Sequence, residues 1–305
     1  MIRKRKLTQQ TSSFNRFAWA LARCLRIPGI FWEKWIAKLL FPKTHSVQLM
    51  TDRVLHLNEA LGLMIPSLTH VLSRRMEEGS WFAFRPFTDD ADKISQSYEQ
   101  VVRRLLSPCP SEIIVDIGAN IGWHTVWLSK KVGPSGKILA VEPEVTNFAI
   151  LELNTRINNL TNVISINLAL GANQGRGRLF VPRPTLMGQV TTEGSNHGSR
   201  PSGASVSFDT LDNLVKSLGI DQVSAIKVDV EGAELAVIRG AEKTISKFGP
   251  RLVIEVHGND NLTSLRHVMK SMNMRVVFEV PASPRRDETR VFVFAVPLAS
   301  HLASQ

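Results

Sequence analysis

Short apolar runs alternate with segments of helical periodicity from about residue 112 to the end of the chain. The runs predict strands at 113–116, 137–142, 163–168, 225–229 and 252–256, and the segments predict helices at 123–131, 145–158, 211–218, 233–248 and 262–272. Two more strands, 275–280 and 290–296, close the chain. Continuous apolar strands that alternate with helices are typical of parallel sheets covered on both faces. We therefore expect an α/β domain with a mostly parallel, seven-stranded sheet and an antiparallel closing strand.

The alternation is interrupted between the third and fourth strands. Residues 177–181 and 204–208 predict two strands that flank a long loop rich in Pro, Gly and Ser, Pro182–Gly203. Long loops within compact domains are usually lids or substrate loops, or have no fixed structure. We expect this loop to help close an acceptor site.

Residues 1–110 follow a different pattern. They are predicted to be mostly helical, with helices at 51–64 and 92–106 and a short strand at Trp81–Phe84. The chain is accordingly divided into an N-terminal extension, residues 1–110, and a domain, residues 111–305.

The net charge of +10 is concentrated near the N-terminus, because residues 1–50 contain ten Lys or Arg and one Glu. Trp and Phe side chains are interleaved with these charges in residues 14–41, but the charges interrupt every apolar run, so no membrane span is expected. Two interpretations stay open: residues 1–41 contact an anionic membrane, or they form a helical hairpin that packs on the protein itself. No specific nucleic acid is expected.

The two cysteines, far apart, indicate a cytoplasmic protein with reduced thiols.

A glycine-containing turn follows the first strand of the domain. Asp116 ends that strand, and Gly118, Asn120 and Gly122 follow it at alternate positions. Gly118 permits a tight turn and the close approach of a ligand to the backbone, and Asn120 tolerates a left-handed conformation. Gly122 lets the next helix begin close to the sheet. Such a turn predicts a nucleotide-type ligand at the carboxyl ends of the strands.

The second strand ends in an acid, Glu142, 26 positions after Asp116. A carboxylate at this place accepts hydrogen bonds from both ribose hydroxyls of an adenosyl ligand or an adenine dinucleotide. The turn lacks the G-x-G-x-x-G spacing of a dinucleotide fingerprint. A nicotinamide-dependent oxidoreductase therefore remains the alternative interpretation from another enzyme class.

Polar side chains follow the fourth and fifth strands. Lys227, Asp229 and Glu231 alternate after one of them, and Glu255 and His257 share a face of the other. We expect these groups to converge on one rim, with a counter-charge for buried Lys227. His257 is the first candidate for a general base because its ordinary pKa lies near neutrality, and Asp229 is the second. Asp229, Glu255 and His257 also suit a divalent metal, although no ligand-spacing motif supports one, and no metal is assigned.

The chain resembles the FkbM family of class I S-adenosylmethionine-dependent methyltransferases. The resemblance covers roughly residues 112–296, and no family resemblance is found for residues 1–100. It is carried by six motifs in the family's order: Val115–Gly122, Val141–Pro143, Asn167–Leu170, Thr210–Asp212, Lys227–Glu234 and Ile254–Glu255. Each motif alone is weak, and together they are specific.

The resemblance implies a Rossmann-like class I methyltransferase fold, S-adenosylmethionine as cofactor, and oxygen methylation of a hydroxyl on a sugar, glycan or similar small molecule. Residues Asp116, Gly118, Asn120 and Gly122 would belong to the cofactor site, together with Asp229, while Glu142 would hold the ribose. Leu168 and Ala169 would border adenine. A non-catalytic membrane or RNA adaptor with a degenerate cofactor fold is a further alternative, supported by the basic arm. The sequence carries no signal for the oligomeric state.

Overall fold

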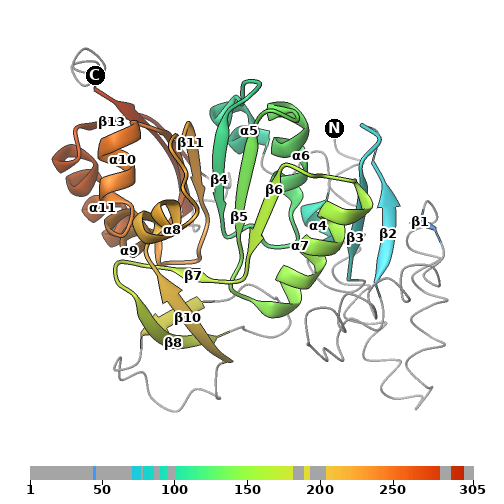
Figure 1. Cartoon of the computed structure of the whole chain (residues 1–305). Helices are drawn as coiled ribbons and strands as arrows, with labels where there is room; N and C mark the ends of the chain where they lie inside the picture. Colours follow the sequence, from blue (N-terminus) through green and yellow to red (C-terminus); the bar gives the residue numbers. More distant parts are fainter. Residues whose placement is uncertain are drawn as a thin grey trace, which may run out of the picture. The chain divides into compact units, whose positions relative to one another are not determined.

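The computed structural model describes residues 44–45, 71–76, 78–85, 90–94, 100–180, 189–192, 204–281 and 290–298 (Figure 1). The chain divides into two compact units, residues 1–92 and 93–305, which are described separately. The predicted helix at 51–64 and the basic arm, residues 1–41, lie outside the described residues. The domain boundary that we place between residues 110 and 111 stays a prediction. In the described part of the chain, no helix combines the length and the apolar character that crossing a membrane requires.

The first unit contains a three-stranded antiparallel sheet in the order β1–β2–β3. Its strands are β1 (Thr44–His45), β2 (Leu72–Arg75) and β3 (Trp81–Phe84). Strand β3 was predicted, but the expectation of a mostly helical segment missed β2, whose short and half-polar sequence carries no strand signal. Beyond β3, buried Arg85 and Asp90 form a bidentate ion pair, with Nε to Oδ2 at 2.7 Å and Nη2 to Oδ1 at 2.8 Å.

The second unit is built on a seven-stranded sheet in the order β13–β14–β12–β11–β4–β5–β6. Five neighbouring strands are parallel, and β14 runs antiparallel to both β12 and β13, as the sequence predicts. The strands are β4 (Ile113–Ile117), β5 (Lys137–Val141), β6 (Val163–Ile166), β11 (Ala225–Val228), β12 (Arg251–His257), β13 (Met274–Pro281) and β14 (Arg290–Pro297).

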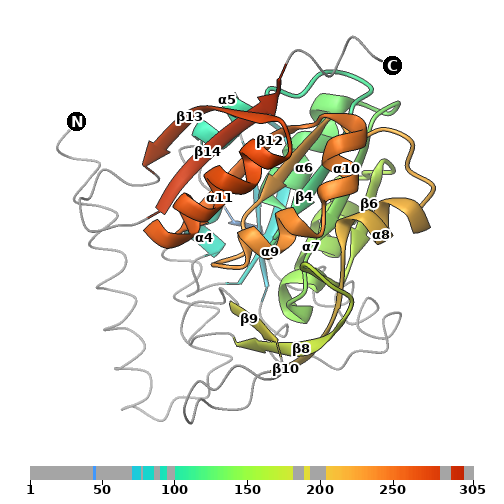
Figure 2. The same ribbon diagram turned by 90° about the vertical axis from the view of Figure 1, so that its left-hand side faces the viewer.

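Helices cover both faces of this sheet, as Figures 1 and 2 show. One face carries α5 (Gln100–Leu106), α6 (Trp123–Val132) and α7 (Val145–Ile157), and the other carries α8 (Leu211–Ser217), α9 (Glu234–Arg239), α10 (Glu242–Phe248) and α11 (Asn259–Ser271). The short helix α4 (Asp90–Lys93) spans the boundary between the two units along the chain. The class I methyltransferase architecture expected from the sequence is therefore present.

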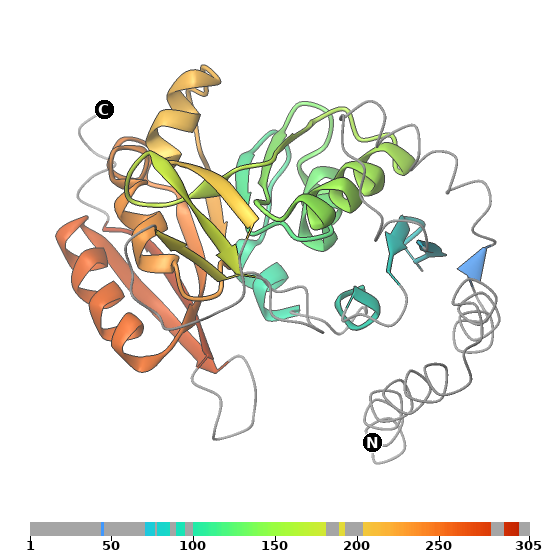
Figure 3. The ribbon, with the colours of Figure 1, turned by 90° about the horizontal axis from the view of Figure 1, so that it is seen from below.

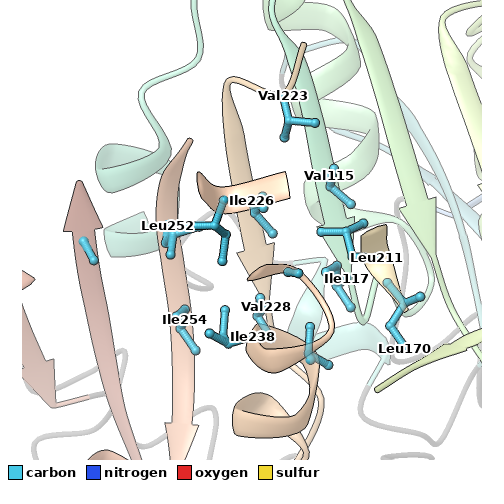
Figure 4. Packing of buried hydrophobic residues seen from close by; sticks show 14 of the residues in the cluster. Val115, Ile117, Leu170, Leu211, Val223, Ile226, Val228, Ile238, Leu252 and Ile254 are labelled. Carbon is cyan, nitrogen blue, oxygen red and sulfur yellow. The ribbon is translucent and has the colours of Figure 1, made fainter. Parts of the chain in front are cut away.

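The central strands are mostly apolar because both of their faces are covered. Val115 and Ile117 of β4 point to the face of α8–α11, where they join Ile226, Val228 and Ile254 in one buried cluster (Figure 4). Intervening positions point toward α5–α7, and two of them, Asp116 and Lys227, are charged. The sheet thus carries a buried charged pair on one face, directly behind the turn that follows β4.

The predicted helix at 233–248 is wrong as a single element, because it divides into α9 and α10 at Gly240. A Cβ atom at Gly240 would lie 2.0 Å from the carbonyl oxygen of Gly171, so only glycine permits this contact. The predicted helix at 92–106 is likewise not continuous in the described residues, which show α4 and α5.

A four-stranded sheet in the order β7–β10–β8–β9 replaces the alternation between β6 and α8 and lies toward the viewer in Figure 3. Its strands are β7 (Ala169–Leu170), β8 (Gly175–Phe180), β9 (Gln189–Thr192) and β10 (Ala204–Asp209). Strands β8 and β10 were predicted, whereas β9 falls within the segment interpreted as a loop, Pro182–Gly203. The rest of that loop lies outside the described residues.

Candidate functional site

A pocket lies at the carboxyl ends of β4, β5 and β11, where the β4–α6 turn meets the segments that follow the other two strands. Leu168, Ala169 and Leu170 form another side of it, together with Leu179 of β8. The edge of a parallel sheet at which connections diverge to opposite faces is the usual ligand site of such folds. The pocket lies where the sequence predicts the cofactor site.

The backbone of the β4–α6 turn packs tightly against the end of β11. Gly118 has a φ of +73°, and a Cβ atom there would lie 1.8 Å from the carbonyl oxygen of Asp229. Asn120 has a φ of +51°, the left-handed conformation that was predicted, and its Oδ1 accepts a hydrogen bond from the Ile121 amide at 2.8 Å. Both Gly118 and Asn120 line the pocket. The turn therefore presents main chain, not side chain, to a ligand.

Gly122 starts α6 but does not line the pocket. Its φ of +88° lies in the left-handed region that favours glycine, and a Cβ atom there would lie 2.7 Å from Cδ1 of Leu151 in α7, the end of a side chain that can shift. His124, in the first turn of α6, is buried and lines the pocket. Trp123 and Trp127 share one face of α6, and the Arg103 guanidinium lies over both rings, at 4.4 and 5.0 Å from their centroids. Both tryptophans thus pack against Arg103, and Trp123 also lines the pocket.

Glu142 lies at the pocket with only 5% of its surface exposed. Its Oε2 accepts a hydrogen bond from the Asn120 amide at 2.8 Å, and its Oε1 accepts one from the Glu144 amide at 2.9 Å. Burial raises the pKa of Glu142 to about 7, although these amide hydrogen bonds lower it. The carboxyl therefore changes charge near neutral pH.

This pKa predicts a pH-dependent affinity for a ribose-containing ligand. Ribose hydroxyls donate to an ionised carboxylate, and most Glu142 carboxyls take up a proton as the pH falls from 8 to 6. We expect the dissociation constant of S-adenosylmethionine, measured by calorimetry, to rise about tenfold over this range. In Glu142→Gln the affinity should be lower at pH 8 and nearly independent of pH. An unchanged wild-type affinity between pH 6 and 8 would contradict this assignment.

Asp116 lies behind the pocket and not in its lining, with none of its surface exposed. Its Oδ1 lies 3.2 Å from Nζ of Lys227, and its Oδ2 accepts a hydrogen bond from the Thr125 hydroxyl at 2.7 Å. Lys227 also donates to the carbonyl oxygen of Gly118 at 3.2 Å. The predicted counter-charge for Lys227 is confirmed. The expected lining role of Asp116 is corrected, because the carboxylate supports the turn through Lys227.

Leu168 and Ala169 line the pocket beyond the end of β6, as the resemblance implies. Asn167, next to them, ties this segment to the end of β5, since its Nδ2 donates to the carbonyl oxygens of Glu142 at 2.9 Å and Pro143 at 3.1 Å. The apolar border and the buried carboxylate thus lie side by side. Their contact with adenine stays a prediction.

Three of the predicted rim residues meet at the other end of the pocket. Ligand atoms of Asp229, Glu231 and His257 all lie within 4.8 Å of one another. Nε2 of His257 lies 3.2 Å from Oε2 of Glu231, and Nδ1 lies 2.7 Å from Oε1 of Glu234, whose side chain is 1% exposed. The convergence of histidine and carboxylates on one rim is confirmed.

The carboxylates around His257 change its charge. Burial lowers its pKa, but the hydrogen bond to Glu234 and the charges of Glu231, Glu234 and Glu255 outweigh burial and raise the pKa to about 9. The pKa of His257 therefore lies well above the ordinary histidine value on which its choice as the first candidate was based. His257 does not line the pocket, whereas Asp229 and Glu231 do. The case for His257 as the base is weakened, and the carboxylates become the first candidates.

The set of residues that could hold a divalent metal also differs from the one considered from the sequence. Glu255 accepts a hydrogen bond from Nη1 of Arg290 at 3.1 Å, and its Oε1 lies 3.9 Å from His257 Nε2. Glu231 takes its place in the group with Asp229 and His257. One imidazole and two carboxylates suit several divalent cations.

Sequence reasoning missed three charged residues of this site. Glu234 belongs to a motif that was identified, but its approach to His257 depends on where α9 begins. Arg290 comes from β14 and Lys93 from before β4, and both line the pocket. No local pattern signals a side chain that the fold brings from so far along the chain.

Comparison with known proteins decides the family. A sequence model described as the methyltransferase FkbM domain matches residues 116–276, more than half of the chain. The chain belongs to the FkbM methyltransferase family. It is an S-adenosylmethionine-dependent methyltransferase, so the nicotinamide-dependent alternative is rejected.

Relatives of this FkbM methyltransferase include Methyltransferase 1 of Beauveria bassiana, 25% identical over 58% of this chain and 78% of that protein. The hexuronic acid methyltransferase AglP of Haloferax volcanii is 30% identical over 52% of this chain and 62% of its own length. Methyltransferase sdnD of Sordaria araneosa is 28% identical over 47% of this chain and 65% of its length. The chain therefore spans less than two thirds of the last two. The FkbM methyltransferase structure from Methylobacillus flagellatus gives a TM-score of 0.44 at 22% identity, over 60% of this chain and 43% of that one.

The pocket of this FkbM methyltransferase fits the cofactor of the family. Glu142 offers a buried carboxylate to a diol, and Leu168 and Ala169 offer an apolar border to a purine. At Gly118 the absent side chain lets the turn pack against the Asp229 carbonyl, and Gly118 itself lines the pocket. These features suit the ribose, the adenine and the amino-acid part of S-adenosylmethionine in turn.

Proposed function

We propose that this enzyme methylates a hydroxyl oxygen of a sugar, a glycan or a comparable natural product. One observation carries the proposal: the carboxylates of Asp229 and Glu231 line the same pocket as Glu142. A proton acceptor thus stands beside the place of the methyl donor. The relative that acts on a hexuronic acid supports a sugar as the acceptor.

Bound S-adenosylmethionine would supply a methyl group on a sulfonium, whose sulfur leaves as a thioether when a nucleophilic oxygen takes the methyl group. The chain has to align the acceptor and remove its hydroxyl proton as the new bond forms. Asp229 is the carboxylate that the sequence puts forward for this role, together with His257. Lys227, whose Nζ lies 3.7 Å from Oδ2 of Asp229, fixes that carboxylate relative to the turn at Gly118.

A transfer assay tests the proposal. The full chain is incubated with methyl-tritiated S-adenosylmethionine and matched pairs of uronic acid and neutral sugar glycosides, including 4-nitrophenyl β-D-glucuronide. We expect a product whose methyl group resists mild alkali, as an ether does. Label that alkali releases as methanol indicates an ester and would contradict methylation of a hydroxyl.

Besides Lys227, the pocket offers an acidic sugar two cationic side chains, of which Arg290 is already paired with Glu255. Arg290 and Lys93 line it together with the carboxylates, and Arg290 is half-exposed. A guanidinium binds a carboxylate with two parallel hydrogen bonds.

We also propose that residues 1–41 contact an anionic membrane and that residues 182–203 act as a lid over the acceptor site. Flotation of the full chain with anionic vesicles tests the first of these.

A further inference from the structure

The pocket contains two carboxylates that can take the hydroxyl proton, and their surroundings differ. Asp229 follows β11 and lies next to the Lys227 ammonium, which also binds Asp116 and the Gly118 carbonyl. It is therefore part of the charged network that supports the cofactor turn. Glu231 lies two residues further along, with a φ of +53°, ahead of Gly232 at +106°. The chain reverses here, and the Glu231 side chain reaches both the pocket and His257.

Glu231 is held by a line of contacts that begins at the buried side chain of Glu234 and passes through the partly buried ring of His257. Glu234, the first residue of α9, has 1% of its side chain exposed, and its Oε1 accepts a hydrogen bond from the Gly232 amide at 2.7 Å. The same oxygen lies 2.7 Å from Nδ1 of His257, which fixes the ring. Nε2, at the far end of the ring, makes no hydrogen bond but lies 3.2 Å from Oε2 of Glu231. Helix α9 thus positions the imidazole, and the imidazole positions the carboxylate.

We propose that Glu231 is the catalytic residue that takes the proton of the acceptor hydroxyl, and that Glu234 is a positioning residue that acts on it through His257. The inference rests on the proposed hydroxyl methylation. As the oxygen–methyl bond forms, the methyl–sulfur bond breaks and its electron pair stays on sulfur. The hydroxyl proton moves to a Glu231 carboxylate oxygen, which later releases it to water.

The electrostatics agree with this assignment. Burial and the neighbouring Asp229 raise the pKa of Glu231, while His257, Arg290 and Lys93 lower it. Glu234 and Glu255 act on Glu231 through the charge they maintain on His257. The net effect raises the pKa of Glu231, and a carboxylate with a raised pKa is a stronger base than an ordinary one.

The first arm of the test needs no acceptor. In the full chain labelled with ¹³C-histidine, NMR should show His257 titrating near pH 9. Glu231→Gln and Glu234→Gln should each lower that pKa, because each removes a negative charge next to the ring. Glu242→Gln, an exposed acid in the first turn of α10, should leave it unchanged. A His257 pKa that is the same in all four chains overturns the inference.

The second arm measures methyl transfer to 4-nitrophenyl β-D-glucuronide. Glu231→Gln should lower kcat about 100- to 10,000-fold, the range of general base catalysis. Its dissociation constant for S-adenosylmethionine should stay within about twofold of wild type, and Glu231→Asp should recover part of kcat. We expect kcat to fall at alkaline pH as His257 loses its proton. In Glu234→Gln this fall should occur at lower pH, with little change in KM. A purely structural role of Glu234 would instead lower kcat equally at every pH. Wild-type kcat in Glu231→Gln overturns the inference, while absence of any transfer by the wild-type chain overturns the proposed function instead.

Discussion

Replacement of Lys227 by Met is expected to lower the free energy of unfolding of the second unit by about 3–5 kcal/mol. The Lys227 ammonium and Asp116 carboxylate are 4% and 0% exposed, and they lie 3.2 Å apart. Removal of the cation leaves a buried carboxylate with the Thr125 hydroxyl as its remaining hydrogen-bond donor among the described contacts. The loss can be measured by urea denaturation followed by circular dichroism.

Two further variants show whether the buried charge is the cause. Lys243→Met removes an exposed lysine from α10 and should change the free energy of unfolding by less than about 0.5 kcal/mol. Asp116→Asn combined with Lys227→Met removes both charges and should recover much of the loss. A double variant as unstable as Lys227→Met would show that packing, and not the unpaired carboxylate, determines the effect.

Gly118→Ala should abolish cofactor binding and destabilise the second unit by roughly 2–5 kcal/mol, the sum of backbone strain and overpacking. The added Cβ would meet the Asp229 carbonyl at 1.8 Å, and a backbone atom cannot turn away as a side chain can. The ends of β4 and β11 would have to separate, which opens the turn that borders the pocket. Thermal unfolding and calorimetry with S-adenosylmethionine measure the two effects.

Gly219→Ala is the matched control for this variant. Gly219 also has a positive φ, +62°, but a Cβ atom there meets no atom within 4 Å. Gly219→Ala should therefore be destabilised only by the strain of the left-handed conformation, about 1 kcal/mol, and should bind the cofactor normally. Equal losses in the two variants would show that conformation alone, and not the contact with Asp229, requires glycine at residue 118.

The sheet of the second unit could be predicted from the sequence because its central strands are buried on both faces. Continuous apolar runs such as Ile113–Val115, bounded by polar turns, are typical of such strands, and each of the seven predicted strands is found. The break at Gly240 could not be predicted, because it depends on the carbonyl of Gly171, which arrives from a different sheet. Strand β9 was missed because its partner is β8, across a segment whose composition indicates a loop.

The same distinction between local sequence and distant contacts applies to the residues of the site. Glu142, Asn120 and Gly118 were predicted because each lies directly after a strand, where chain order fixes position. The charge on His257 was not, because it depends on Glu234 reaching across from α9 and on Glu255 lying close by. A pKa is a property of the surroundings in space, and a single chain position does not determine it.

The pocket has walls of two different origins. Its cofactor end is made by turns of the seven-stranded sheet, whereas Leu179 belongs to β8 of the four-stranded sheet, which enters the chain between β6 and α8. We expect residues 171–209 to tolerate exchange for another insertion, because the strands that precede Gly118 and Glu142 pair only within the seven-stranded sheet. The contact of Gly171 with Gly240 and the pairing of β7 with β10 restrict such an exchange at its two ends. In evolutionary terms, the apolar wall beside Leu168 and Ala169 is free to vary on one sheet, while the carboxylates of the pocket stay under the constraints of the other.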